Sequence, residues 1–141
     1  MGVRKATGLF LLLLTTLCLA PCIRSQDQRF KMFLKQHYDS PRTDARRDYC
    51  GFMMQQRGMI KPCKTLNTFI HASQKQILAV CREGGTIYHG THQSHTPLAI
   101  TTCKLKNLVT GGCKYESHAA FKYISIVCDQ AGWPVHFNEG V

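Results

Sequence analysis

Six cysteines in a short exported chain do more than any other feature to limit what this protein can fold into. The sequence holds eight cysteines, and we expect Cys18 and Cys22 to be removed with an apolar N-terminal leader. An even number of cysteines in a small exported domain is typical of a disulfide framework, although spacing does not choose among the possible pairings. Zinc is the competing interpretation, but the sequence contains no Cys-x-x-Cys pair. The six that remain are Cys50, Cys63, Cys81, Cys103, Cys113 and Cys128.

An apolar run at the start of the chain predicts export. It follows the basic pair Arg4-Lys5 and is too short to span a bilayer, as expected for a signal peptide. We expect the signal peptide to cover residues 1–25, with cleavage after Cys22 as the alternative. The domain then covers residues 26–141, which is 141 − 25 = 116 residues and a single-domain length. We expect it to be secreted and soluble, because no second apolar segment follows.

Net charge narrows the partners of the secreted form. The full chain has 18 Lys and Arg against 8 Asp and Glu, and the leader removes Arg4, Lys5 and Arg24. The secreted form therefore carries 15 basic and 8 acidic residues, a net charge of +7. This charge favours polyanionic partners, namely RNA, heparin-like glycans or anionic bacterial surfaces. Charge alone does not choose among them.

A helical spacing of apolar residues marks the start of the domain. The residues at positions i, i+3, i+4 and i+7 are Phe30, Phe33, Leu34 and His37, which predicts an amphipathic helix. His37 therefore lies on the buried face of this helix. A single histidine on such a face is more often a core residue than a catalyst, so the spacing leaves its role open.

The rest of the chain predicts two more helices and then strands. Asp44 or Thr43 can cap a second helix, which ends at Gly58. Ser73 can cap a short third helix. Helices first and antiparallel strands afterwards predict an α+β domain. The expected strands cover residues 66–71, 86–88, 98–105, 113–115, 121–128 and 135–137.

Three short stretches share one resemblance. Residues 63–69 read Cys-Lys-Thr-Leu-Asn-Thr-Phe, with Gln36-His37 before them and Pro134-Val135-His136-Phe137 after them. Together they resemble the pancreatic-type ribonuclease (ribonuclease A) superfamily, and within it the angiogenins and the three-disulfide ribonucleases of fish. The resemblance covers essentially the whole chain after the leader and implies three helices packed on a bent antiparallel β-sheet, with no cofactor. The disulfide pairs that it implies are Cys50–Cys103, Cys63–Cys113 and Cys81–Cys128.

The resemblance also implies metal-free cleavage of single-stranded RNA after pyrimidines. RNA carries its own nucleophile, the 2′-hydroxyl group, so the protein need only move two protons and stabilise charge. The implied roles are base for His37, acid for His136 and stabiliser of phosphoryl charge for Lys64. Imidazoles suit these roles because an ordinary pKa of about 6.5 makes both protonation states available at neutral pH. The first product is a 2′,3′-cyclic phosphate.

Six further positions match substrate-binding positions of the superfamily. The resemblance implies that Thr68 reads the pyrimidine base, that Phe137 packs beside it, and that the others contact phosphate or shape the base pocket. In the last strand, period-two alternation predicts that Val135 and Phe137 are buried and that His136 points to the opposite face. The six positions are Gln36, Lys35, Asn67, Thr68, Val135 and Phe137.

Two residues depart from the family pattern. Asn138 stands where the family typically has an aspartate that holds the C-terminal histidine, and an amide cannot stabilise an imidazolium by charge. We therefore expect reduced turnover. Glu139 stands where angiogenins have a glutamine that helps to obstruct the pyrimidine pocket, and the sequence ends at Val141 without their C-terminal extension. We expect an open pocket and more activity than an angiogenin shows.

Three histidines and several possible partners remain to be interpreted. His89, His92 and His95 are three residues apart in a polar stretch, which could be a copper or zinc site or a polar loop, and we favour the loop. The resemblance adds an endothelial cell-surface receptor and a ribonuclease inhibitor as partners of a monomer. Angiogenic signalling or antibacterial action without catalysis is the alternative function. Nuclear delivery through Arg46-Arg47 is a further hypothesis, against which we favour a solvated helix face.

Overall fold

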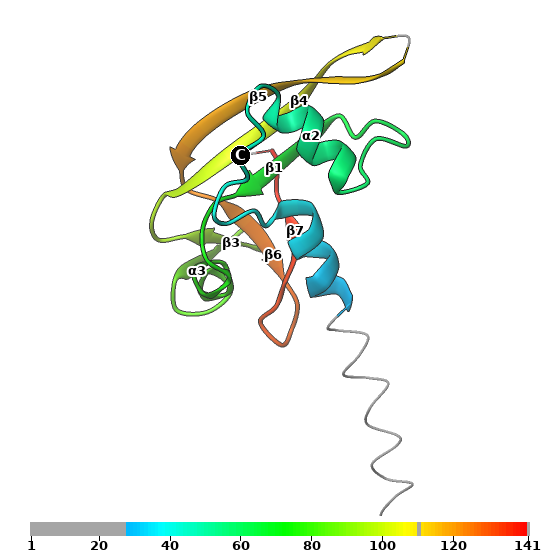
Figure 1. The fold of residues 1–141 in the computed structure, drawn as a ribbon. Coiled ribbons are helices and arrows are strands. Elements are labelled where there is room, and N and C mark those ends of the chain that lie inside the picture. The colour runs from blue at the N-terminus through cyan, green and yellow to red at the C-terminus, as the bar shows by residue number, and fades with distance from the viewer. Residues whose placement is uncertain (1–27, 110, 141) are drawn as a thin grey trace, which may run out of the picture.

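The computed structural model describes residues 28–109 and 111–140, and it forms two antiparallel sheets with helices packed against them (Figure 1). One sheet has the strand order β1-β4-β5 and the other has the order β2-β3-β6-β7. Residues 28–37 form the first helix. The other elements are α2 (Tyr49–Gln56), β1 (Leu66–Ile70), α3 (Gln74–Val80), β2 (Gly85–Tyr88), β3 (Thr91–Ser94), β4 (Leu98–Val109), β5 (Gly112–Lys122), β6 (Ser125–Cys128) and β7 (Pro134–Phe137). The predicted α+β architecture is confirmed.

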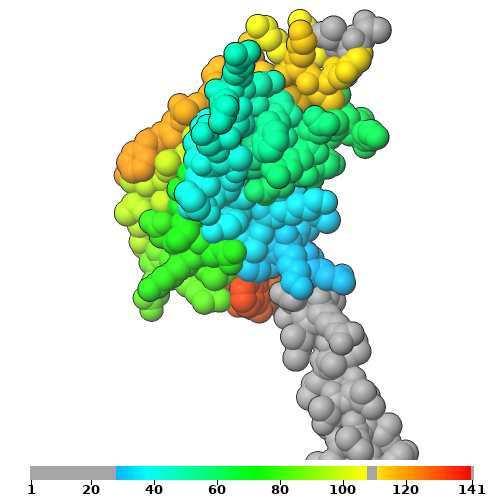
Figure 2. All heavy atoms as spheres, in the orientation of Figure 1, coloured from blue at the N-terminus to red at the C-terminus, as the bar shows by residue number. Residues whose placement is uncertain are grey.

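The two ends of the domain lie side by side. In Figure 1 the first helix, in blue, runs next to β7, in red, and Figure 2 shows orange-red atoms of the segment that precedes β7 against the blue helix at the surface. The rings of Phe30 and Trp133 are 4.9 Å apart, and those of His37 and Phe137 are 5.3 Å apart. The predicted inward face of the helix is confirmed, because Phe30, Phe33 and His37 are buried. This packing brings residues from opposite ends of the chain into one site.

Two clusters of apolar side chains hold the elements together. One joins the first helix, α3, β4, β6 and β7 around Phe33, Ile77 and Ile126. The other lies under α2 and contains Met53 and Phe69. Disulfide bonds reinforce both clusters, and each contributes roughly 2–4 kcal/mol by restricting the unfolded chain. The bonded pairs are Cys50–Cys103, Cys63–Cys113 and Cys81–Cys128, the pairs that the resemblance implies.

The second helix begins later than predicted. Its cap is Asp48, whose carboxylate accepts a hydrogen bond from the Gly51 amide, and not Asp44 or Thr43. Thr43 instead donates to the buried carboxylate of Asp39 through its amide and its hydroxyl. These bonds occupy Thr43, and the Asp44 carboxylate accepts from the Arg46 amide, so neither side chain is available to cap the helix. The predicted stop is confirmed, since Gly58 has a positive φ of 74° after the helix.

The histidine segment is not the loop that we expected. Residues 85–94 form a β-hairpin, in which β2 pairs with β3 through the register Tyr88↔Thr91. His89 and Gly90 both have positive φ values, 50° and 77°, which suits a two-residue hairpin turn. The predicted strand over residues 121–128 is also interrupted, because β5 ends at Lys122 and β6 begins at Ser125.

Some expectations concern parts of the chain outside the described residues. The signal peptide over residues 1–25 and both cleavage positions lie there. Within the described residues, no helix is long and apolar enough to cross a membrane. The same part of the chain holds no group of three or more His, Cys, Asp or Glu side chains that could bind a metal ion.

Candidate active site

The fold gathers the predicted catalytic side chains around the end of the first helix. His37 comes from that helix, Lys64 from the segment before β1, and His136 from β7. The Phe137 ring, next to His136 in β7, stacks on the His37 ring, and Asn67 links the Lys64 ammonium to the Gln36 carbonyl oxygen next to His37. Segments at both ends of the domain therefore contribute to one cluster.

His37 is buried and held in one orientation. Its side chain is only 3% exposed, and its ring is stacked on Phe137 and tilted against Phe33. Its Nδ1 lies 2.8 Å from the Thr68 carbonyl oxygen, so Nδ1 must donate and carry the hydrogen. Burial, followed by the charges of Lys64 and His136 and against the effect of the Thr68 bond, lowers the pKa of His37 to about 4. At neutral pH the ring is therefore neutral, and Nε2 has a free lone pair.

A hydrogen-bonded chain fixes the lysine next to the first helix. The Lys64 ammonium donates to Asn67 Oδ1 at 2.8 Å, and Asn67 Nδ2 donates to the Gln36 carbonyl oxygen at 2.9 Å. Burial lowers the pKa of Lys64, and the Glu139 carboxylate opposes that effect. Asn67 is fully buried, so it positions Lys64 and helix residue Gln36 together. This bridging role of Asn67 was not predicted, although an asparagine three residues after a lysine could have suggested it.

The C-terminal histidine is on the exposed side of β7. His136 is exposed and Phe137 is buried, as the alternation predicts. Val135 is only half-buried, while Pro134 is fully buried, because an irregularity between Val127 and Cys128 shifts the register of β7. The expected alternation is therefore wrong at Val135.

Asn138 is engaged within its own turn. Its Oδ1 accepts a hydrogen bond from the Gly140 amide at 3.2 Å, and its backbone amide donates to the Ser125 carbonyl oxygen at 2.9 Å. These bonds hold the chain that follows β7 against β6. The amide oxygen therefore serves the turn between Asn138 and Gly140.

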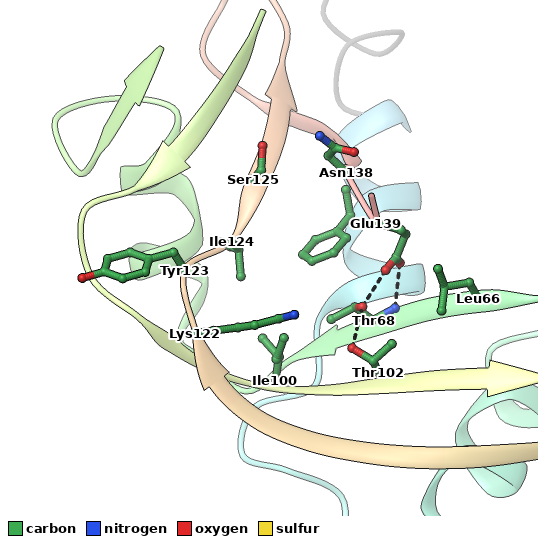
Figure 3. Close-up of a pocket in the computed structure, with 11 residues that line it drawn as sticks. Leu66, Thr68, Ile100, Thr102, Lys122, Tyr123, Ile124, Ser125, Asn138 and Glu139 are labelled. Carbon is green, nitrogen blue, oxygen red and sulfur yellow. Dashed lines mark hydrogen bonds between the residues drawn. The ribbon is translucent and has the colours of Figure 1, made fainter. Parts of the chain in front are cut away.

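A small pocket next to His37 is closed by a carboxylate (Figure 3). It has a cavity volume of about 80 Å³ and contains Thr68, Phe137 and Glu139. The Glu139 carboxylate accepts from the Thr68 amide at 2.8 Å and from the Thr68 hydroxyl at 2.6 Å. The expectation of an open pocket is wrong, because both groups of Thr68 that could read a base are occupied.

Gln36 lies next to the cluster of His37, Lys64 and His136, whereas Lys35 and the histidine triplet make contacts elsewhere. Gln36 is half-buried next to His37, and its carbonyl oxygen takes part in the bridge from Asn67. Lys35 is exposed, and its ammonium points towards Gly58 beyond the end of α2. Of the histidine triplet, His95 bonds to the Thr86 hydroxyl across the hairpin.

Comparisons with known proteins agree with this arrangement. The family model described as pancreatic ribonuclease matches residues 28–138. An angiogenin of Sus scrofa is 40% identical over 138 residues, covering 93% of this chain and 90% of that protein. A ribonuclease of Chelydra serpentina is 42% identical over 120 residues, covering 82% of this chain and all of that protein. The crystal structure of green turtle egg white ribonuclease has a TM-score of 0.73 at 40% identity, covering 80% of this chain and 98% of that one.

These matches define the class of protein. The chain belongs to the pancreatic ribonuclease family and is a pancreatic-type endoribonuclease.

Proposed function

We propose that this protein is a secreted endoribonuclease that cleaves single-stranded RNA after pyrimidines, without a metal ion. The observation that carries the proposal is the state of His37. Its Nδ1 donates to the Thr68 carbonyl oxygen, and its pKa is lowered to about 4, so Nε2 is a free base at neutral pH. A neutral imidazole with one fixed tautomer suits removal of a proton from a hydroxyl group.

The reaction needs two proton transfers and one displacement at phosphorus. His37 Nε2 takes the proton of the 2′-hydroxyl group, and the 2′-oxygen attacks the adjacent phosphorus. The bond from phosphorus to the 5′-oxygen breaks, and protonated His136 supplies a proton to that oxygen. The products are a 2′,3′-cyclic phosphate and a free 5′-hydroxyl group, and water opens the cyclic phosphate in a later step.

Lys64 stabilises the charge that develops on the phosphoryl oxygens. Its ammonium is half-buried and is aimed by Asn67, which also bonds to the Gln36 backbone. A fixed positive charge in a partly desolvated site stabilises a transition state more than a mobile surface charge does. The side chain of Gln36 would donate to the same phosphate, and exposed Lys35 would contact a neighbouring one.

The pyrimidine would enter the Thr68 pocket once Glu139 leaves. A pyrimidine presents a carbonyl oxygen and N3 along one edge, which fit the amide and hydroxyl of Thr68. Asn67 and Val135 would shape the entrance, and Phe137 would pack against the base. Because Glu139 holds the same two groups of Thr68, we infer weak activity on small substrates.

Replacement of each histidine tests this proposal. His37→Ala and His136→Ala should each lower cleavage of a pyrimidine-containing RNA by about 10²-fold or more. His118→Ala is the matched control, because His118 is an exposed histidine that bonds to Glu116 on β5. Mass spectrometry of the products that the wild-type protein forms from RNA should show the 2′,3′-cyclic phosphate. DNA of the same sequence should not be cleaved. Full activity in either site variant would overturn the assignment.

The partners other than RNA follow from charge and from the relatives named angiogenin. A net charge of +7 on the secreted form suits heparin-like glycans and anionic bacterial surfaces. An endothelial receptor and a ribonuclease inhibitor are the further partners that we propose for the monomer. The catalytically inactive His136→Ala variant separates these functions, because antibacterial action through charge should survive and signalling that needs turnover should be lost.

A further inference from the structure

An exposed aromatic ring lies at the tip of the β2–β3 hairpin. The side chain of Tyr88 is 63% exposed. Its ring meets the His89 ring at a centroid distance of 4.3 Å and an interplanar angle of 78°. An edge-on contact of this kind leaves at least one face of the phenol ring uncovered by His89.

The hairpin fixes the backbone that carries this ring. The His89-Gly90 turn has positive φ at both residues, which matches the twist of a two-residue hairpin. The Thr91 hydroxyl donates to the Tyr88 carbonyl oxygen at 2.8 Å, and the Ser125 hydroxyl donates to the Thr91 hydroxyl at 2.9 Å. Tyr88 is therefore tied to β6, the strand that forms one wall of the Thr68 pocket.

A second cavity lies between Tyr88 and one wall of the Thr68 pocket. It has a volume of about 200 Å³ and extends from Tyr88 and His89 to Ser125 and Asn138. Ser125 and Asn138 also line the Thr68 pocket, so the two cavities share a wall. Figure 3 shows these two residues on the opposite side of the pocket from Thr102. The second cavity therefore borders the proposed base site through Ser125 and Asn138.

The shared wall indicates which part of an RNA strand would reach Tyr88. In the proposed function the phosphate on the 3′ side of the pyrimidine lies among His37, Lys64 and His136. Among the described residues that line the second cavity, none of these three occurs. In that arrangement the strand on the 5′ side of the pyrimidine, which leaves the Thr68 pocket away from the catalytic groups, would run towards the second cavity.

We propose that Tyr88 is a stacking platform for the base of the nucleotide on the 5′ side of the cleaved pyrimidine. The inference rests on the proposed function and adds a binding site for a second base to it. An exposed aromatic ring beside a nucleic-acid strand stacks on any base, because every base has a π-face. The site therefore favours RNA chains over dinucleotides and does so with little preference for the identity of the 5′ base.

Cleavage of matched substrates tests the platform. The wild-type protein should cleave ApUpA with a kcat/KM about five-fold or more above that of UpA, the low end for base stacking on an aromatic ring. Tyr88→Leu should remove this advantage and leave UpA cleavage unchanged, while Tyr88→Phe should keep it. Ile87→Ala is the matched control, because Ile87 is an equally exposed apolar residue on the adjacent position of β2.

Two further substrates identify the source of the advantage. If stacking is the source, a trinucleotide whose 5′ nucleotide lacks its base should be cleaved no faster than UpA. If attraction to the extra phosphate is the source, the abasic trinucleotide should keep the gain. UpApA, extended on the 3′ side, should be insensitive to Tyr88→Leu. The proposal is overturned if Tyr88→Leu keeps the ApUpA advantage, if the abasic substrate shows the full gain, or if only UpApA responds. Failure of the wild-type protein to cleave UpA would instead count against the proposed function.

Discussion

The two halves of the candidate site use their hydrogen bonds in opposite ways. Around His37, the bond from Nδ1 to the Thr68 carbonyl oxygen fixes the ring and leaves the reactive Nε2 free. In the adjacent pocket, Glu139 takes up both the amide and the hydroxyl of the same Thr68. One residue of β1 thus supports the catalytic half through its carbonyl oxygen and is blocked in the binding half. In the proposed function, the catalytic half is therefore prepared before substrate arrives, whereas the binding half must first exchange a partner.

The largest expected effect is on the catalytic half, through Lys64. Lys64→Met should lower kcat for RNA by about 10²- to 10³-fold, because a fixed charge at the phosphoryl oxygens is lost. Since the charge of Lys64 also lowers the pKa of His37, the acidic limb of the pH profile of kcat/KM should move to higher pH. Lys114→Met, on the exposed side of β5, is the control. A kcat near the wild-type value would show that the lysine is not in the reaction path.

Burial of His37 should also make folding sensitive to acid. Its folded pKa of about 4 lies below the ordinary value of about 6.5, so the unfolded chain binds the proton first as the pH falls. The contribution of the neutral His37 ring to the free energy of unfolding is fully present above pH 6.5. It is lost as the pH falls to about 4, which lowers the free energy of unfolding by about 3 kcal/mol. Urea unfolding of the wild type and of His37→Gln at pH 7 and pH 4 measures it. The variant should lose less stability than the wild type, and equal losses would contradict the buried neutral ring.

The catalytic half is the part that could be predicted from the sequence. His37 falls on a regular apolar stripe, and that local periodicity fixes which face of the helix it occupies. The histidine and lysine motifs then match a known family. Glu139 could not be predicted, because its contact with Thr68 joins residues 71 positions apart. Whether a tail folds back depends on the completed tertiary structure and on which backbone groups it leaves unpaired.

Two predicted elements differ from the structure. Thr43 and Asp44 carry a good capping signal, but Asp39 is already fixed by Tyr49 and attracts Thr43 away from the helix start. The histidine segment has a turn signal in His89-Gly90, which is weaker than an Asn-Gly turn and was outweighed by its polar composition. At the helix start, a local preference competed with a partner that only the fold supplies.

The binding half should respond to removal of its carboxylate. Glu139→Ala frees both groups of Thr68, and we expect kcat/KM for a dinucleotide such as UpA to rise about ten-fold, as the loss of roughly 1–2 kcal/mol of competing hydrogen bonds implies. Glu139→Gln should give a smaller rise, because its amide oxygen keeps one of the two accepted bonds, while the other carboxylate oxygen is replaced by an NH2 donor. Glu83→Ala, which removes an exposed carboxylate elsewhere, is the control. An unchanged kcat/KM in Glu139→Ala would show that the closed pocket does not limit binding.

The smallest expected effect concerns Thr102, which lies 3.1 Å from the Thr68 hydroxyl and sets its direction. While Thr68 donates to Glu139, Thr102 must be the donor to Thr68, because a carboxylate only accepts. With cytosine bound, the Thr68 hydroxyl again donates its hydrogen, now to N3 of the base. Thr102 is then only an additional donor to Thr68, and its loss is tolerated. With uracil bound, Thr68 accepts from N3–H, and its own hydrogen needs Thr102 as an acceptor.

Thr102→Val would leave that hydrogen without a partner in a buried site, which costs more than the loss of one accepted bond. Cleavage of UpA should therefore fall by about three- to five-fold, and cleavage of CpA by less. Combining Thr102→Val with Glu139→Ala should preserve this difference between the two bases, since it arises after the carboxylate has left. If both substrates fall equally, Thr102 acts only in packing, and the direction of the Thr68 hydroxyl is set by Glu139 and the base alone.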